Sequence, residues 1–111
     1  MQKGRVFRNR VEVGEISKDI ERDKESIYLF SYVESYLKNP DSVPISVNFP
    51  LRKEAFSSSY LFAFFANMLA EGNAKTIQCQ KMRIDESDIF TRLLLTVKHD
   101  PVGSITVEEI V

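Results

Sequence analysis

Residues 60–70 read Tyr-Leu-Phe-Ala-Phe-Phe-Ala-Asn-Met-Leu-Ala, and Asn67 is the one strongly polar member. This run predicts a helix that is apolar on all sides, and such a helix has to be covered on every side. It is too short to cross a bilayer, which takes roughly 20 residues. We expect Ser58 or Ser59 to cap its start, and Gly72 in a left-handed conformation to end it. Either the rest of the domain or a partner protein must cover this helix.

The composition is that of one folded domain, residues 1–111. Hydrophobic residues make up 43% and charged residues 28%, which is typical of a globular chain. The net charge of -1 gives no positive field to gather nucleic acid, and no apolar segment of the signal-peptide kind follows the basic N-terminus. Cys79 is the single cysteine, so an intramolecular disulfide is excluded. We therefore expect a cytoplasmic protein that does not enter membranes and needs no cofactor.

The first part of the chain predicts a β-hairpin followed by a charged loop. Residues 5–16 place short apolar runs on both sides of Asn9, a residue that tolerates the positive φ of a tight turn. Residues 18–25 carry seven charges of both signs. This favours a solvated loop over the alternative of a binding patch, because the charges nearly cancel.

Three later segments have the pattern of strands. Residues 26–33 are apolar at even and odd positions and predict a central strand that is covered on both faces. Residues 45–49 alternate in polarity between two prolines, which cannot donate to a ladder, and predict another strand. Residues 105–107 predict a closing strand after the turn signal at Asp100–Pro101.

Two further helices are expected after the apolar one. A weak pattern covers residues 74–83, and a stronger one follows the acidic residues 85–88, which suit the positive end of a helix. The apolar stripe of that stronger helix consists of Ile89, Phe90, Leu93 and Leu94. The predicted fold is a single α+β domain, with a mostly antiparallel sheet and about three helices packed on it.

The sequence lacks the motifs of an enzyme that acts alone. Its four glycines do not cluster, which excludes a phosphate-cradling loop. His99 and Cys79 are single, which excludes the usual zinc sets, and a turn histidine and an ordinary cysteine explain them best. Capping and solvation explain the acids at 85–88 and 108–109 better than acid–base chemistry does. We expect no catalytic residue, no metal and no direct binding of nucleic acid.

Five pieces of the chain, in this order, resemble the N-terminal domain of HipA-type serine/threonine kinase toxins. They are Gly14-Glu15-Ile16, Tyr28-x-Phe30-x-Tyr32 with Tyr36-Leu37 behind it, the run from Pro44 to Arg52, the run from Leu61 to Gly72, and His99-Asp100 with Gly103 to Val107. Ala63 and Ala70 stand where that family usually has prolines, which favours a more regular apolar helix. The resemblance spans nearly the whole chain and implies the fold of that domain.

In full-length HipA-type proteins a kinase body follows this domain, whereas this chain ends at Val111. The resemblance therefore implies a stand-alone, HipS-like antitoxin of bacteria, which is no enzyme and neutralises a separately encoded HipA-like kinase. ATP and magnesium would belong to that kinase, and a helix-turn-helix DNA-binding protein would join through it. The alternatives are an accessory subunit that completes a split kinase and a DNA-linked autoregulator. A homodimer would also hide an apolar surface.

The candidate partner-binding residues come from the idea that a former intramolecular interface stays apolar when a chain is split. Aromatic side chains are the commonest anchors of interfaces. Phe56 lies in a predicted loop and is expected to be the most exposed, whereas most aromatic residues of the helix are expected to be core. The candidates are Phe56, Tyr60, Phe62, Phe64 and Phe65, with Arg52 and Lys53 as charges at the rim.

Overall fold

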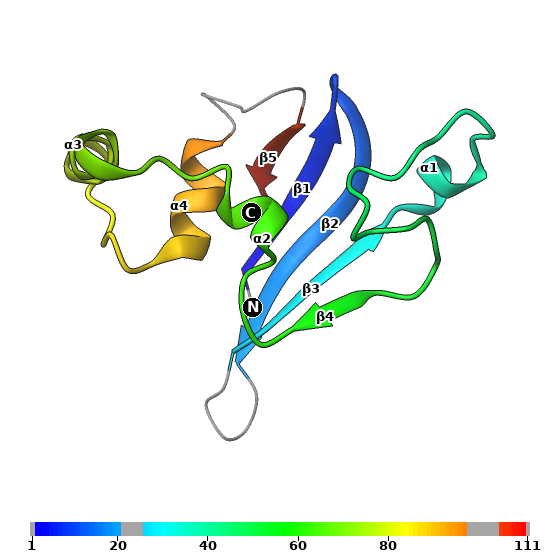
Figure 1. The fold of residues 1–111 in the computed structure, drawn as a ribbon, viewed down its shortest axis with the longest axis horizontal. Helices are drawn as coiled ribbons and strands as arrows, with labels where there is room; N and C mark the ends of the chain where they lie inside the picture. The colour runs from blue at the N-terminus through cyan, green and yellow to red at the C-terminus, as the bar shows by residue number, and fades with distance from the viewer. Residues whose placement is uncertain (1, 21–25, 98–104, 111) are drawn as a thin grey trace.

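The computed structural model describes residues 2–20, 26–97 and 105–110. Within them, five strands form one antiparallel sheet in the order β4-β3-β2-β1-β5 (Figure 1). The strands are β1 (Gln2–Arg8), β2 (Val11–Ile20), β3 (Ser26–Tyr32), β4 (Phe56–Ser58) and β5 (Ile105–Glu109). The predicted antiparallel sheet and its closing strand are confirmed. The turn expected at Asp100–Pro101 lies outside the described residues, as does His99.

The β1–β2 hairpin has the turn that the sequence predicts. Asn9 and Arg10 both have a positive φ, of 50° and 70°, and Arg8 pairs with Val11 across them. Two left-handed residues in succession match the right-handed twist of the flanking strands. The backbone tolerance of Asn9 therefore fixes the register of the hairpin.

β2 is longer than predicted. Residues 18–20 pair with β3, which corrects the loop expected to begin there. The rest of that expected loop, residues 21–25, lies outside the described residues. Gly14 allows β2 to lie close to β3, because a Cβ at this position would stand 2.4 Å from the carbonyl oxygen of Ser31 and 2.8 Å from the ring of Phe30.

Only one face of β3 is deeply buried. Tyr28, Phe30 and Tyr32 point into the core, whereas Ile27 and Leu29 on the opposite face are half-buried. The prediction of a strand covered on both faces is therefore wrong. Antiparallel sheets commonly pack one face on the core and leave the other to solvent, and this sheet does the same.

Four helices accompany the sheet in the described part of the chain. Figure 1 shows α2 and α4 beside the sheet, α1 at the opposite side of the molecule, and α3 beyond α4 and away from the sheet. They are α1 (Glu34–Lys38), α2 (Ala63–Ala66), α3 (Gly72–Met82) and α4 (Ile89–Thr96). The two predicted later helices correspond to α3 and α4, and α1 was not predicted. The α+β fold class is confirmed.

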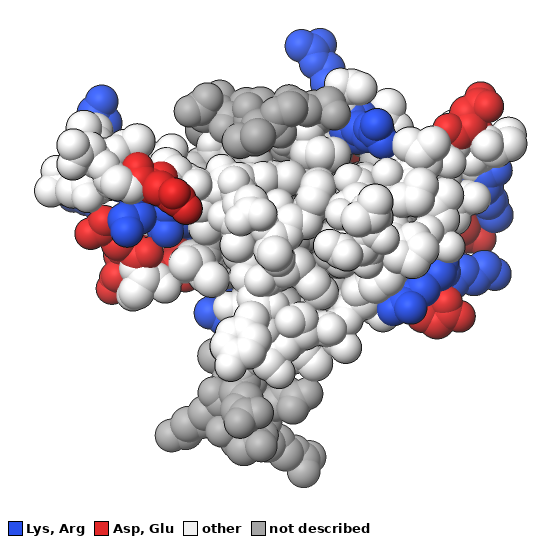
Figure 2. All heavy atoms as spheres, in the orientation of Figure 1, with Lys and Arg blue, Asp and Glu red and all other residues white. Residues whose placement is uncertain are grey.

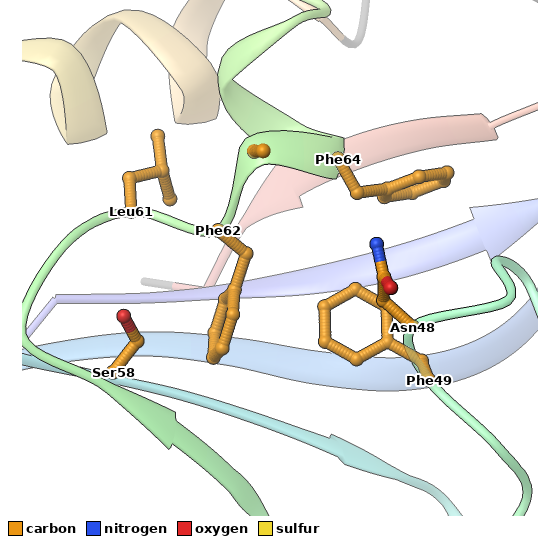
Figure 3. A pocket seen from close by; sticks show the side chains of 7 residues that line it. Asn48, Phe49, Ser58, Leu61, Phe62 and Phe64 are labelled. Carbon is orange, nitrogen blue, oxygen red and sulfur yellow. The ribbon is translucent and has the colours of Figure 1, made fainter.

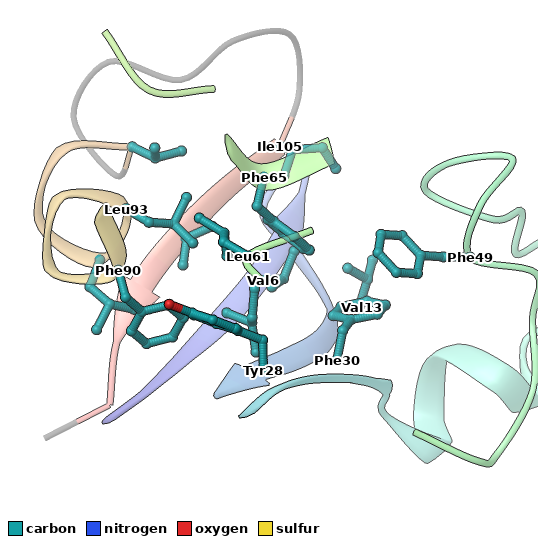
Figure 4. Close-up of a cluster of buried hydrophobic side chains, with 14 of the residues drawn as sticks. Val6, Val13, Tyr28, Phe30, Phe49, Leu61, Phe65, Phe90, Leu93 and Ile105 are labelled. Atoms are coloured by element: carbon teal, nitrogen blue, oxygen red, sulfur yellow. The ribbon is translucent and has the colours of Figure 1, made fainter. Parts of the chain in front are cut away.

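The core lies between the sheet and the layer formed by α4 and the segment around α2 (Figure 4). Val6 of β1, Phe30 of β3, Phe65 of α2 and Phe90 and Leu93 of α4 are all fully buried. The rings of Phe30 and Phe65 are 5.6 Å apart. Phe65 therefore anchors α2 to the sheet.

The apolar stretch 60–70 forms one helical turn, α2, and not the long helix predicted from its composition. Leu61 and Phe65 are buried in the core, but Tyr60 is 81% exposed. The stretch is thus covered on one side and not on all sides. The other apolar side chains of the stretch are half-buried or exposed.

The ends of α2 also differ from expectation. The helix follows Phe62, which makes no side-chain capping bond, while the Ser58 hydroxyl accepts a hydrogen bond from the amide of Tyr60. Gly72 has the predicted left-handed conformation, with φ of 60°, but it begins α3 and does not end the apolar helix. The alanines at the family's proline positions do not extend α2, which ends at Ala66.

Residues 45–49 form a turn and not the predicted strand. The Tyr32 hydroxyl accepts a hydrogen bond from the amide of Ile45 and donates one to the carbonyl of Phe49, so it fixes both ends of this turn. Phe49 is buried while Val47 is 94% exposed. The alternation in the sequence therefore does not define one strand face.

Candidate functional site

One face of the molecule, which we call the uncharged face, lacks charged side chains in its middle. Figure 2 shows the Lys, Arg, Asp and Glu residues of the described chain around the periphery of this view, and the surface over α2 in its middle carries none. Along the segments that flank α2, the large apolar side chains left exposed are Val47, Leu51 and Tyr60. An uncharged surface with exposed apolar side chains is a candidate site of interaction.

The uncharged face is hollowed by a pocket of about 270 Å³, which we call the aromatic slot (Figure 3). Phe49 forms its floor and the rings of Phe62 and Phe64 form two walls. The Phe62 ring stands at 81° to Phe49 with 5.1 Å between centroids, and the Phe64 ring stands at 90° with 6.1 Å. The other residues that line the slot are Asn48, Ser58, Leu61 and Ala63.

The floor of the aromatic slot is held firmly by the core. The ring of Phe49 lies 4.9 Å from Phe30 and 5.1 Å from Phe56, and its backbone carbonyl accepts the Tyr32 hydroxyl. Each of these neighbours is itself buried. Edge-to-face packing between aromatic rings adds to the stabilisation from burial alone. The slot is therefore a preformed feature of this fold.

The structure separates the predicted partner-binding aromatics into two groups. Phe56 is only 9% exposed and lies in β4, so the expectation that it is the most exposed of the set is wrong. Phe65 is fully buried. Tyr60 is exposed, and Phe62 and Phe64 are half-buried walls of the slot. The first two are core residues, and the last three reach the surface.

The two predicted rim charges, Arg52 and Lys53, are both exposed. Arg52 lies over the ring of Phe56, 3.8 Å from its centroid, and donates hydrogen bonds to the carbonyls of Glu54 and Ala55. Its guanidinium therefore covers Phe56 from the solvent side. This cation–π contact, together with the rings of Phe30 and Phe49, buries a phenylalanine that lies in a three-residue edge strand.

Sequence reasoning missed Asn48 and Phe49 as site residues. Both were assigned to a strand between Pro44 and Pro50, although an asparagine followed two residues later by a proline is also typical of a turn. The hydroxyl of Tyr32 that closes this turn comes from β3. No local pattern reports such a long-range contact.

The titratable groups do not form a reactive cluster at the aromatic slot. Burial raises the pKa of the Tyr32 hydroxyl, and hydrogen bonds from the amide and hydroxyl of Ser87 lower the pKa of the exposed Asp85. Among the described residues, no group of three His, Cys, Asp or Glu is placed to hold a metal ion. Cys79 is buried in α3. What the slot can do chemically is enclose an apolar group.

None of the helices in the described ranges is long and apolar enough to cross a membrane.

The chain resembles a protein of Haemophilus influenzae that has no assigned function, with 36% identity over 90 residues, which cover 79% of this chain and 78% of that protein. It also resembles the putative kinase Y4mE of Sinorhizobium fredii, with 26% identity over 92 residues, which cover 83% of this chain but 22% of the kinase. Among solved structures, the N-terminal domain of HipA toxin matches the whole chain and 94% of its own, with a TM-score of 0.67 and 29% identity. The family model of the HipA N-terminal domain matches residues 4–108. The chain therefore belongs to the HipA N-terminal domain family.

Proposed function

We propose that this protein is an antitoxin that binds a separately encoded HipA-like Ser/Thr kinase in the cytoplasm and restrains it. The chain itself catalyses nothing in this proposal, and ATP and magnesium belong to the kinase. A helix-turn-helix DNA-binding protein joins the assembly through the kinase, without direct contact between this chain and DNA.

Two relatives support a role as a separate polypeptide. The match to the putative kinase covers 22% of that protein, whereas the match to the Haemophilus influenzae protein covers 78% of its length. The same domain thus occurs within a larger protein and as most of a small one. A domain that occurs both within a larger protein and as a small protein is expected to keep the surface through which it contacts a kinase body.

The observation that carries the proposal is the uncharged face with its aromatic slot. Tyr60 and Val47 both expose large apolar side chains, and each is next in sequence to a residue that lines the slot, Leu61 and Asn48 respectively. A stable interface takes roughly 800 Å² from each partner, and its centre is depleted in charge and rich in aromatic residues. The uncharged face has this character.

The test is to purify the chain with HipA-like kinases cloned from the genome that encodes it, and to measure binding and phosphoryl transfer from ATP. We expect a stoichiometric complex in which phosphoryl transfer is lowered. Tyr60→Asp should weaken binding at least tenfold, because it places a carboxylate in an apolar interface. The matched control is Val11→Asp at the hairpin end, where the valine is 58% exposed, and it should bind as the unchanged chain does.

Each alternative has its own outcome in this experiment. Phosphoryl transfer that rises when the chain is added would identify an accessory subunit of a split kinase. Failure of every such kinase to bind would refute the proposal. A mobility-shift titration of the chain alone should show no DNA complex, and binding that falls steeply with salt would favour a DNA-linked autoregulator.

A further inference from the structure

We infer that the aromatic slot receives one apolar side chain from an extended segment of the partner, while Asn48 binds the main chain of that segment. The identity of this partner as a kinase rests on the proposed function, but the chemistry of the slot does not. The sequence identified aromatic residues of this chain as candidate anchors of an interface, without a direction of insertion. At the slot the partner's side chain enters this chain.

The size of the slot limits what it can hold. Pockets for cofactors and drug-sized ligands measure roughly 300 to 1,000 Å³. The aromatic slot, at about 270 Å³, is below this range and is partly open to solvent. It fits a single side chain better than a nucleotide or another cofactor. The rings of Phe49, Phe62 and Phe64 all line the slot and offer that side chain an aromatic surface (Figure 3).

The charge around the slot selects an apolar occupant. No residue that lines it is charged, and the face around it in Figure 2 is uncharged in its middle. A charged side chain that entered would lose water and find no counter-ion, which is strongly unfavourable. A leucine, methionine or phenylalanine side chain has no charge to remove from water, and it buries apolar surface on both partners.

The polar groups at the slot suit a peptide main chain. The carboxamide of Asn48 lines the slot beside Phe49, and within the described residues no hydrogen bond of this carboxamide is seen. A carboxamide presents two N–H donors and a carbonyl acceptor, which is the complement of a peptide unit. Across the slot, the Ser58 oxygen accepts the amide of Tyr60, so its hydroxyl hydrogen is left to donate.

The first test uses capped amino acids and the full chain, without any kinase. N-acetyl-phenylalaninamide and N-acetyl-leucinamide are titrated while NMR follows the side-chain amide of Asn48 and the rings of Phe62 and Phe64. We expect saturable shifts with Kd on the order of 1 mM, which is what the ligand efficiency of so small a probe allows. N-acetyl-lysinamide and the corresponding aspartic acid derivative should give no saturation below roughly ten times that concentration.

Ala63→Leu fills the slot from an exposed position and should abolish the shifts, whereas Ala74→Leu, at an exposed position of α3, should leave them unchanged. Asn48→Ala should weaken binding of both apolar probes about fivefold, the loss of roughly one hydrogen bond. Equal binding of charged and apolar probes, or saturable shifts that persist in Ala63→Leu, would overturn the inference. So would shifts of the same signals with protein concentration alone, because a second copy of the chain would then occupy the slot.

The kinase experiment separates this inference from the proposed function. A complex that forms with the unchanged chain and weakens at least tenfold with Ala63→Leu, but not with Ala74→Leu, supports both. A complex that is indifferent to Ala63→Leu refutes the slot as a partner site and leaves the proposed function standing. If the apolar probes bind and no kinase does, the proposed function fails and the chemistry of the slot stands.

Discussion

Replacement of Arg92 by methionine tests how α3 is held to the domain. Arg92 lies on α4 and is only 5% exposed. Its guanidinium donates to the carbonyl of Ala70, at 2.7 Å, and to that of Glu86, at 3.3 Å. These two carbonyls lie just before and just after α3, so one buried side chain ties both ends of the helix to α4.

The rest of α3 is weakly anchored. Figure 1 shows it beyond α4 and away from the sheet, and Cys79 is its one buried residue. Gly72 at its start and Arg83 at its end both have a left-handed conformation, with φ of 60° and 56°. Lys75 and Thr76 of α3 also contact Glu86. These contacts are open to solvent and contribute little to stability.

The size of the effect can be worked out from these contacts. A hydrogen bond that involves a charged group contributes about 1.5–3 kcal/mol, and the longer of the two counts at the lower end, so their loss costs about 3–5 kcal/mol. Methionine also removes a buried guanidinium whose Nε has no partner in the structure, which returns about 1–3 kcal/mol. The expected net loss is about 2 kcal/mol, or roughly 8–16 °C in Tm for a domain of this size.

Urea denaturation measures the global loss, and hydrogen exchange shows where it occurs. In Arg92→Met, amides of α3 should lose far more protection than those of β1 and β2. Arg92→Lys keeps the charge but not the forked donor. Its stability and the protection of its α3 amides should lie between those of the unchanged chain and those of Arg92→Met. Unchanged stability and unchanged protection of α3 would show that Arg92 does not hold the helix. Equal loss of protection in α3 and in the sheet would show that α3 is no separate unit.

Three smaller predictions concern the base of the aromatic slot and the start of α4. Tyr32→Phe removes the hydroxyl that fixes residues 45–49 and should cost about 1–2 kcal/mol in urea denaturation at pH 7. Burial raises the pKa of Tyr32 above its unfolded value near 10. The contribution of this hydroxyl to the free energy of unfolding is therefore complete below pH 10 and is lost as the pH rises through the folded pKa. Over that pH window Tyr32→Phe should lose less stability than the unchanged chain. Phe56→Ala should lower the free energy of unfolding by about 3–5 kcal/mol, and a variant that stays fully stable would contradict its place in the core. Asp88→Ala removes the bond to the amide of Thr91 and should cost about 1 kcal/mol in the same assay, whereas no change would mean that water replaces the cap.

The elements that could be predicted from the sequence are those with a local physical cause. Asn9 tolerates the positive φ of the hairpin turn, and the hairpin is found there. Asp88 precedes an apolar stripe with helical spacing, and α4 begins directly after it with Asp88 as its cap. In both cases the residues that decide the conformation are neighbours in the chain, so a pattern in the sequence is enough.

The turn at 45–49 could not be predicted because its cause is distant. Its alternating apolar residues fit a strand as well as a turn, and the Tyr32 hydroxyl that selects the turn comes from β3. Phe56 was misplaced for a similar reason, since Arg52 and the rings of Phe30 and Phe49 bury it only in the folded domain. The floor of the aromatic slot therefore depends on contacts that the linear pattern does not contain.

The apolar stretch 60–70 shows why composition alone could not separate core from interface. A helix of one turn has no stability of its own, so α2 exists because Phe65 is locked into the core. Once that single anchor is placed, the chain on either side is free to curve, and the rings of Phe62 and Phe64 fall at the surface as walls of the slot. Burial of all the apolar residues would have required a full helix surrounded by protein, which a domain of this size with one sheet face already open does not provide. The surplus of aromatic residues over what the core can hold is thus the physical basis for expecting a partner at this face.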